Sequence, residues 1–237
     1  MTYDVSALIC VRNGEAYLAE AIESILAQTT RPHEILVVDD GSTDASRDVA
    51  SAFAPHVTVH ARPALGVGAA RQHAVEASSG HLVAFLDADD LWSSDYLELH
   101  VEAHRERPAI DATVSTVLPF LSPDVDPAAV TAAAESLEPR RGMLVAATVI
   151  RREAMHAVGP FDATLPFTDQ DWLMRAVDAG LQFGDVPKAT VRRRIHGNNS
   201  TLTATADFQG RLAVLKRGLD RRRIARAQPR DSGEDDS

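Results

Sequence analysis

The stretch VSALICVRNGEAYLAEAIESILAQTTRPHEILVVDD, residues 5–40, decides the fold. Its two ends, 5–11 and 34–40, are apolar runs of strand length. Between them, the apolar residues of 17–26 recur at helical spacing, with acidic residues on the other face. Two apolar strands joined through one helix form a unit whose strands run parallel. The stretch therefore predicts a parallel sheet with helices packed against it.

The same alternation continues to residue 92. Residues 57–61 and 81–90 predict two further strands, and 41–54 and 66–80 predict two further helices. Strand runs this apolar are typical of a sheet covered by helices on both faces. The sequence therefore predicts an α/β fold with a mainly parallel sheet.

Beyond residue 92 the alternation is less regular. A basic amphipathic helix is expected over 206–227 and a disordered acidic tail over 228–237. The elements expected before them are a helix over 93–108, a loop with a short helix at 128–134, a strand and a helix within 142–162, a helix over 168–181 and a polar loop at 192–201.

Composition excludes several classes of protein. The chain has 237 residues, of which 45% are hydrophobic, enough for a sizeable core. A formal net charge of -10 argues against a nucleic-acid partner, which calls for a basic face. The single cysteine excludes an internal disulfide and fits a reducing compartment. Because the sequence has neither a signal-peptide pattern nor a membrane-spanning window, we expect a cytoplasmic protein without a transmembrane segment.

Polar groups follow the predicted strands at the points where they end. Arg12-Asn13 follows the first strand, 39–42 the second and 87–90 the fourth, while Gly66 follows the third. In an open parallel sheet, ligands bind outside the carboxyl ends of the strands. The four segments therefore predict one binding site at that edge.

Asp87 and Asp89 give this site a metal-binding character. Two residues apart on an extended strand end, their carboxylates project the same way. Two close carboxylates repel each other unless a cation lies between them. Mn²⁺ or Mg²⁺ takes one or two carboxylates and completes its shell with water and phosphate oxygens. The pair therefore predicts a divalent metal that holds a diphosphate.

These segments together resemble the family 2 glycosyltransferases, which have the nucleotide-sugar-binding GT-A fold. The resemblance covers residues 5–92 and resumes at GPFD (159–162), TDQDW (168–172) and RIHGNNS (194–200). It implies metal-dependent transfer of a sugar from a nucleoside diphosphate, most often UDP in this family, to an acceptor hydroxyl.

The resemblance also implies a division of the chain. Residues 1–112 correspond to the nucleotide-sugar-binding half of a GT-A domain, a Rossmann-like sheet flanked by helices. Residues 113–205 correspond to a smaller region that binds the acceptor and carries the catalytic base. The acceptor itself is left open between a glycan, a lipid-linked glycan, a small molecule and a peptide. The basic helix at 206–227 leaves room for peripheral membrane contact.

Most of the residue roles that the resemblance implies concern the donor and the metal. The nucleotide-binding positions are Val11, Arg12, Asn13, Asp39, Asp40, Gly66, Arg71, Asp87 and Ala88. Asp87-Ala88-Asp89 matches the family's Asp-x-Asp (DXD) motif, with Asp89 the favoured direct ligand. His196 lies in the late loop that closes over the diphosphate, so the metal-ligand set is Asp87, Asp89 and His196.

The catalytic base stays open between Asp169 and Asp171. The family has an acidic pair where this chain has Thr168-Asp169, with a second acid at Asp171. Positions two apart on a helix diverge by about 200°, so only one of them faces the donor, and we favour Asp169. One base and no evident nucleophile imply a single displacement with inversion at the sugar carbon.

Other departures from the family pattern bear on the remaining alternatives. Cys10 stands at a usual proline and Gln72 at a usual asparagine. We read Cys10 as a buried small hydrophobe, and the histidines other than His196 as surface or loop residues. The alternative function is a catalytically inactive nucleotide-sugar-binding or scaffold protein of the same fold.

Overall fold

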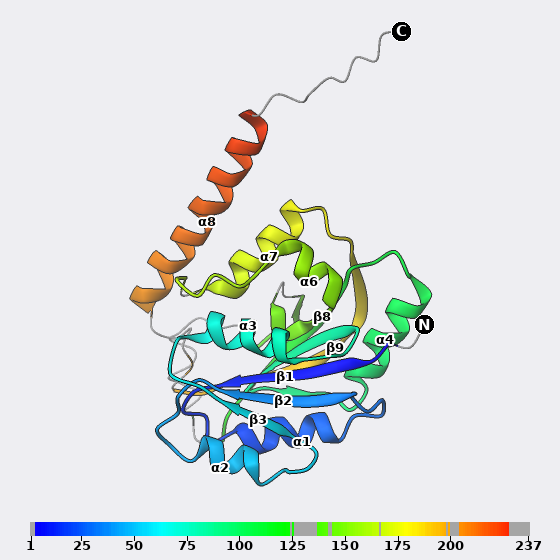
Figure 1. Cartoon of the computed structure of the whole chain (residues 1–237), viewed down its shortest axis with the longest axis vertical. Helices are drawn as coiled ribbons and strands as arrows, with labels where there is room; N and C mark the ends of the chain where they lie inside the picture. The colour runs from blue at the N-terminus through cyan, green and yellow to red at the C-terminus, as the bar shows by residue number, and fades with distance from the viewer. Residues whose placement is uncertain are drawn as a thin grey trace.

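The computed structural model describes residues 3–123, 125, 137–141, 144–165, 167–197, 199 and 204–227. These residues form one mixed sheet with helices on both faces (Figure 1). The strands are β1 (Val5–Val11), β2 (Glu34–Asp39), β3 (Thr58–Ala61), β4 (Leu82–Asp87), β5 (Leu91–Trp92), β6 (Ala112–Leu121), β7 (Arg140–Arg141), β8 (Thr148–Arg151) and β9 (Phe183–Ile195). The helices are α1 (Leu18–Leu26), α2 (Ser46–Ser51), α3 (Val67–Ala77), α4 (Tyr96–Glu106), the 3₁₀ turn η1 (Val145–Ala147), α6 (Arg152–Val158), α7 (Thr168–Asp178) and α8 (Ala204–Ala227).

The sheet has a parallel half and a mixed half. Its strand order is β3-β2-β1-β4-β8-β6-β9-β5, with β7 added beside β6. Strands β1 to β4 pair in parallel, as the sequence predicts. Strand β8 is antiparallel to both β4 and β6, and β9 is parallel to β6. The direction of the strands therefore changes at β8, between the parallel half and β6.

Alternate residues of the central strands face two separate cores. Ile9 of β1 packs in the core beneath α1, whereas its neighbour Leu8 packs in the core beneath α3. Figure 1 shows α1 and α2 on one face of the sheet and α3, α6 and α7 on the other. Each buried leucine or isoleucine contributes about 1.5–3 kcal/mol. Burial on both faces accounts for the nearly continuous apolar runs of these strands.

The prediction of a loop at 192–201 is wrong for residues 192–195, which belong to strand β9. The strand continues to Ile195, paired in parallel with β6 from Val117↔Val191 to Leu121↔Ile195. The arginines at 192–194 suggested solvent, yet Arg194 is only 4% exposed. Its guanidinium donates hydrogen bonds to residues far away in sequence, so the polarity of the local sequence does not predict exposure at this position.

Two histidines on α4 also differ from expectation. His100 and His104 are fully buried, with Thr113 Oγ1 2.6 Å from His100 Nδ1 and the Val149 carbonyl oxygen 3.2 Å from His104 Nε2. A neutral imidazole behaves as a small amphipathic core residue when one nitrogen finds a partner. Both were expected at the surface.

The C-terminal helix α8 projects from the domain beyond α7 (Figure 1). Its Val214 and Gly218 are buried, while Leu212, Leu215 and Leu219 are exposed. Its apolar side chains therefore lie on two sides instead of the single face expected of an amphipathic helix. The described helices include none long and apolar enough to cross a membrane. The short helix expected at 128–134 and the tail at 228–237 fall outside the described residues.

Candidate active site

Parallel pairing brings the ends of β1, β2 and β4 together. Val11 lies opposite Asp39, and Cys10 lies opposite Asp87. The polar segments that follow these strands therefore start side by side, as predicted. Among them, Asn13 has a φ of 55°, a left-handed conformation that asparagine tolerates.

Asn13 fixes the loop after β1 to the loop after β2. Its Oδ1 accepts the Thr43 N–H at 2.8 Å, and its own N–H donates to Ser42 Oγ at 3.0 Å. The two loops form one continuous wall at the carboxyl edge of the sheet.

Asp39 and Asp40 have different environments although both are buried. The Asp40 carboxylate accepts the N–H groups of Leu65 at 3.1 Å and Gly66 at 2.8 Å. It therefore shapes the loop that leads into α3, where Gly66 has a φ of 94°. Asp39 Oδ1 accepts the Ser42 N–H at 2.9 Å, and Oδ2 has no partner among the described residues. Asp39 thus keeps an acceptor for a ligand.

Arg71 of α3 links two acidic groups that are far apart in sequence. Its Nη2 donates to Asp87 Oδ1 at 2.9 Å, and its Nη1 forms an ion pair with Asp169 of α7. Arg71 is 6% exposed, and its guanidinium lies 5.9 Å from the centre of the Phe85 ring. The resemblance implies that Arg71 binds the nucleotide, and in the structure its guanidinium contacts the carboxylates of Asp87 and Asp169.

Asp169 and Asp171 point to different partners from the first turn of α7. Asp169 meets Arg71 at the carboxyl edge of the sheet. Asp171 is buried and accepts from Arg175 Nε and Arg221 Nη1, each at 2.8 Å. The structure therefore brings Asp169, and not Asp171, to the strand ends.

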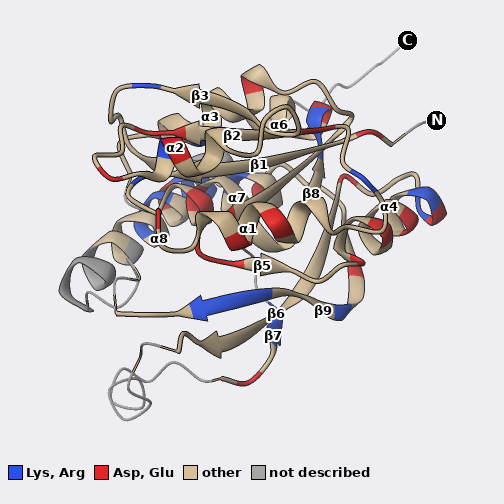
Figure 2. Cartoon of the chain, turned by 90° about the horizontal axis from the view of Figure 1, so that it is seen from below, with Lys and Arg blue, Asp and Glu red and all other residues tan. Residues whose placement is uncertain are grey.

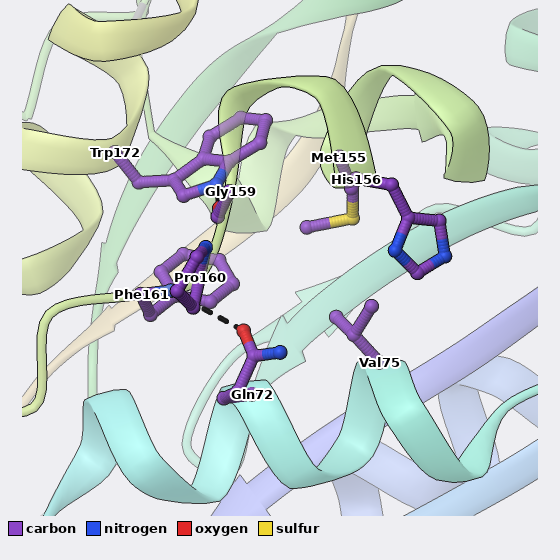
Figure 3. Close-up of a pocket in the computed structure, with 8 residues that line it drawn as sticks. All are labelled: Gln72, Val75, Met155, His156, Gly159, Pro160, Phe161 and Trp172. Atoms are coloured by element: carbon purple, nitrogen blue, oxygen red, sulfur yellow. Dashed lines mark hydrogen bonds between the residues drawn. The ribbon is translucent and has the colours of Figure 1, made fainter.

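The loop before α7 is fixed to α3. Gln72 Oε1 accepts the Phe161 N–H at 3.3 Å, and Trp172 Nε1 donates to the Gly159 carbonyl at 2.9 Å. Figure 3 shows Gln72 reaching from α3 toward this loop. The cavity between them is about 100 Å³, which is small for a ligand pocket. Gln72 and Trp172 thus hold the loop that leads into α7, the helix that carries Asp169.

Asp89 meets the segment that follows β9. His196 Nε2 lies 3.0 Å from Asp89 Oδ2, and Asn199 Nδ2 donates to the same oxygen at 3.3 Å. Asn199 Oδ1 in turn accepts the His196 N–H at 2.5 Å. The Asp89 side chain remains 32% exposed, so it is open to a ligand.

Asp90 and Cys10 lie beside the site without entering it. Asp90 is 4% exposed and accepts the Arg194 N–H at 2.9 Å. Burial, with the charges of Asp89 and Asp87 adding to it, raises its pKa well above the usual range. Burial likewise raises the pKa of the Cys10 thiol to about 12, so it stays protonated. A protonated thiol is a poor nucleophile, and Cys10 is half-buried against the core beneath α3.

Comparison with known proteins identifies the family of the chain. The family model described as Glycosyl transferase family 2 matches residues 6–165. The chain belongs to this family. An uncharacterized glycosyltransferase of Nostoc, alr2836, is 30% identical over 91% of this chain and 72% of its own length. The putative teichuronic acid biosynthesis glycosyltransferase TuaG of Bacillus subtilis is 36% identical over 44% of this chain and 42% of its own length.

Solved structures support the GT-A fold of this family 2 glycosyltransferase. S. aureus TarS 1-349 in complex with UDP has a TM-score of 0.68 at 19% identity, covering 91% of this chain and 65% of TarS 1-349. Its complex with UDP-GlcNAc gives 0.68 at 17% identity, with coverage of 89% and 65%. At such identity the likeness concerns the fold alone. The chain spans between 42% and 72% of the length of the relatives named here.

The residues of this glycosyltransferase fit a divalent metal that shares its shell with a diphosphate. Asp89 Oδ2 and His196 Nε2 lie 3.0 Å apart, and a carboxylate oxygen and an imidazole nitrogen are both groups that could bind a divalent metal. The described residues contain no group of three or more His, Cys, Asp or Glu that could hold an ion. Asp87 bonds to Arg71, so Asp89 and His196 are the two candidate ligands in contact, and Mg²⁺ usually completes its shell with phosphate oxygens or water.

The sequence analysis of this glycosyltransferase missed Arg194. Its Nε donates to the Asp89 carbonyl at 3.1 Å and its Nη2 to Glu20 at 2.7 Å. The guanidinium also lies 4.7 Å from the centre of the Tyr17 ring. Arg194 thus holds the backbone of the Asp-x-Asp motif. The signal in the sequence was a run of three arginines just before His196 in an acidic chain, which we assigned to a loop.

Proposed function

We propose that this family 2 glycosyltransferase transfers a sugar from a UDP-sugar to an acceptor hydroxyl, with a divalent metal and inversion at the sugar carbon. One observation carries this function. Arg71 contacts both Asp87 of the metal-binding motif and Asp169, the base candidate. The group that handles the leaving diphosphate and the group that takes the acceptor proton therefore belong to one site. The binding of UDP and UDP-GlcNAc by TarS, which has the same fold, favours UDP as the nucleotide.

The donor would lie across the ends of β1, β2 and β4. Asp39 Oδ2 has no partner among the described residues and would accept a hydrogen bond from the base. Val11 and Asn13 would line the nucleoside pocket, while Asp40 keeps Gly66 in place without touching the donor. The glycine before α3 leaves the backbone accessible beside the phosphates.

Asp89 and His196 would hold the metal on the side of the diphosphate, and Asp87, which bonds to Arg71, would lie beside it. When bound, Mn²⁺ or Mg²⁺ supplies positive charge that stabilises the departing UDP. Asn199 orients His196 through the backbone, and both side chains reach the same Asp89 oxygen. Arg194 donates to the Asp89 carbonyl, so the backbone of the Asp-x-Asp motif would stay in place when the motif's carboxylates bind the metal.

Asp169 would take the proton from the acceptor hydroxyl. Arg71 orients this carboxylate, and the Asp171 carboxylate is bonded to two arginines away from the strand ends. Burial raises the pKa of the Cys10 thiol, which leaves it protonated and a poor nucleophile. A direct displacement by the acceptor, with inversion, is the mechanism these groups support.

A thermal-shift series tests this function. Purified protein is heated with UDP, GDP, dTDP, ADP or CDP, each with and without Mn²⁺. A ligand that binds only the native state stabilises it by about 2.7 kcal/mol at a hundredfold excess over Kd. We expect a rise in melting temperature with UDP that requires Mn²⁺. No rise with any nucleotide would contradict the function, and metal-dependent UDP binding with no UDP-sugar turnover is what an inactive binding protein would show.

A further inference from the structure

A groove of about 600 Å³ opens beside the metal-binding motif, with Leu91 and Arg194 in its lining. It lies between the start of α1 and the three strands β5, β9 and β6. Its main lining residues are Tyr17, Glu20, Leu91, Phe120, Arg192 and Arg194, which we call the arginine groove. Its volume lies within the range of small-molecule sites.

The arginine groove is continuous with the candidate active site. The Tyr17 ring lies 4.7 Å from the His196 ring, and His196 contacts the Asp89 carboxylate. Arg194 contacts the Asp89 carbonyl on the same side. One imidazole therefore separates the groove from the motif, and a ligand that fills the groove lies next to the reacting groups.

Aromatic rings and guanidinium groups form the floor of the groove. Arg194 lies between Tyr17 and Phe120, 4.7 Å and 4.8 Å from their ring centres. The positive charge of Arg194 is balanced, because its Nη2 bonds to the Glu20 carboxylate. Glu20 is the acidic side chain of the lining. The pair of Arg194 and Glu20 is thus neutral and structural.

Arg192 is the second arginine in the lining of the groove. It is exposed, and its guanidinium lies 4.6 Å from the centre of the Phe120 ring. The structure gives it no acidic partner among the described residues. Stacking on Phe120 restricts the side chain while leaving its N–H groups for a ligand, and a guanidinium matches carboxylate and phosphate oxygens in pairs.

Arg192 lies exposed in a chain whose net charge is -10. Arg141 of β7, one strand from β9, forms an ion pair with Asp185 and so adds no net charge. Figure 2 shows the arginines of β9 and β7 as blue segments on the lower side of the molecule. A local cationic surface on an acidic protein attracts anionic ligands.

We infer that the arginine groove binds an acidic carbohydrate portion of the acceptor, with its carboxylate or phosphate on Arg192 and its sugar ring beside Phe120 and Tyr17. This inference rests on the proposed function, since it names the acceptor class of the same enzyme. Within the part of the chain that the structure describes, no contact joins Arg192 to Arg71 or Asp169, so the acidic group would belong to a part of the acceptor away from the reacting hydroxyl.

Calorimetric titration with three soluble probes tests the groove. Trigalacturonate carries carboxylates, maltotriose 6-phosphate carries a phosphate, and maltotriose is neutral. We expect at least one charged probe to bind about tenfold or more tighter than maltotriose, and less tightly as salt is added. The identity of the charged probe that binds shows whether the groove recognises a carboxylate or a phosphate.

Variants at Arg192 make the test specific. Arg192→Glu is expected to weaken the charged probe about tenfold or more, and Arg192→Lys to retain much of the affinity. Arg105→Glu, at an exposed site on α4, is the matched charge reversal and should change nothing. Equal binding of all three probes, no binding of either charged probe, or equal effects of the two reversals would overturn the inference.

UDP binding with Mn²⁺, measured on the same preparations, separates this inference from the proposed function. If UDP binds wild type and Arg192→Glu alike and neither charged probe binds, the groove assignment is wrong and the proposed function stands. A charged probe that binds through Arg192 while UDP does not bind removes the proposed donor and keeps the groove.

Discussion

Arg71 donates a hydrogen bond from Nη2 to Asp87 Oδ1 at 2.9 Å, and its other terminal nitrogen holds Asp169. The guanidinium fork makes both contacts at once because its donors point in fixed directions. A helix on one face of the sheet thereby joins the end of β4 to the first turn of α7.

Replacing Arg71 by lysine tests this bridge. A lysine ammonium is a single point charge and cannot reach both carboxylates in the same geometry. We expect Arg71→Lys to lower kcat about tenfold or more through misplacement of Asp169, with much less change in UDP binding. Arg152→Lys is the control, since Arg152 bonds to the Gly80 and Val75 carbonyls away from the site. A loss of UDP affinity with unchanged kcat would place Arg71 on the phosphates instead.

Asp171→Asn should affect stability and not turnover. The substitution leaves Arg175 and Arg221 without their buried carboxylate, at a cost of about 1–3 kcal/mol in the free energy of unfolding. Urea denaturation measures the cost, and turnover per folded molecule should match wild type. A large loss of kcat at unchanged stability would move the base from Asp169 to Asp171.

Asp89→Asn should remove the metal dependence of nucleotide binding. An amide oxygen is a weaker ligand for a hard cation than a carboxylate, and the contact with His196 loses its charge. We expect calorimetry to show UDP affinity that no longer rises with Mn²⁺. Asp44→Asn is the acidic control, since the Asp44 carboxylate accepts hydrogen bonds from the Ser46 hydroxyl and the Glu15 backbone N–H in a neighbouring loop. Undiminished Mn²⁺ dependence in Asp89→Asn would exclude Asp89 from the metal site.

The buried histidines of α4 should make the protein sensitive to acid. Burial lowers the pKa of His100 to about 3 and that of His104 to about 4. The unfolded chain, with histidine pKa values near 6.5, then binds more protons than the folded chain below that pH. Stability is therefore complete above pH 6.5 and falls toward pH 4, by up to about 2 kcal/mol for each histidine between pH 6.5 and 5.

Denaturation of wild type and His100→Gln at pH 7.5 and pH 5 checks this expectation. The variant cannot take up the proton at position 100, so it should lose less stability between the two pH values. Equal losses would mean that His100 titrates alike in the folded and unfolded chains.

The parallel half of the fold was predictable because burial on both faces leaves apolar runs that local sequence displays. The ends of those runs placed Asp39, Asp87 and Asp89 at one edge, and the structure brings these residues together. The course of β9 was not predictable in this way. Arg194 is buried by Tyr17, Glu20 and Phe120, which are far away in sequence, so nothing near it signals burial.

The choice between Asp169 and Asp171 also depended on distant partners. Helical geometry shows that the two diverge, but it does not say which one faces the site. Arg71 and Arg221, which are 150 residues apart in the chain, decide this by holding one carboxylate each. The roles of His100 and His104 were hidden for the same reason, because their partners lie on β6 and β8.

Asp169→Asn, measured for UDP release from a UDP-sugar and for UDP binding on the same preparation, tests the central claim most directly. We predict that the variant binds UDP with Mn²⁺ within about twofold of wild type, while release of UDP falls by about a hundredfold or more. Release at the wild-type rate would contradict the assignment of Asp169 as the base and the mechanism built on it.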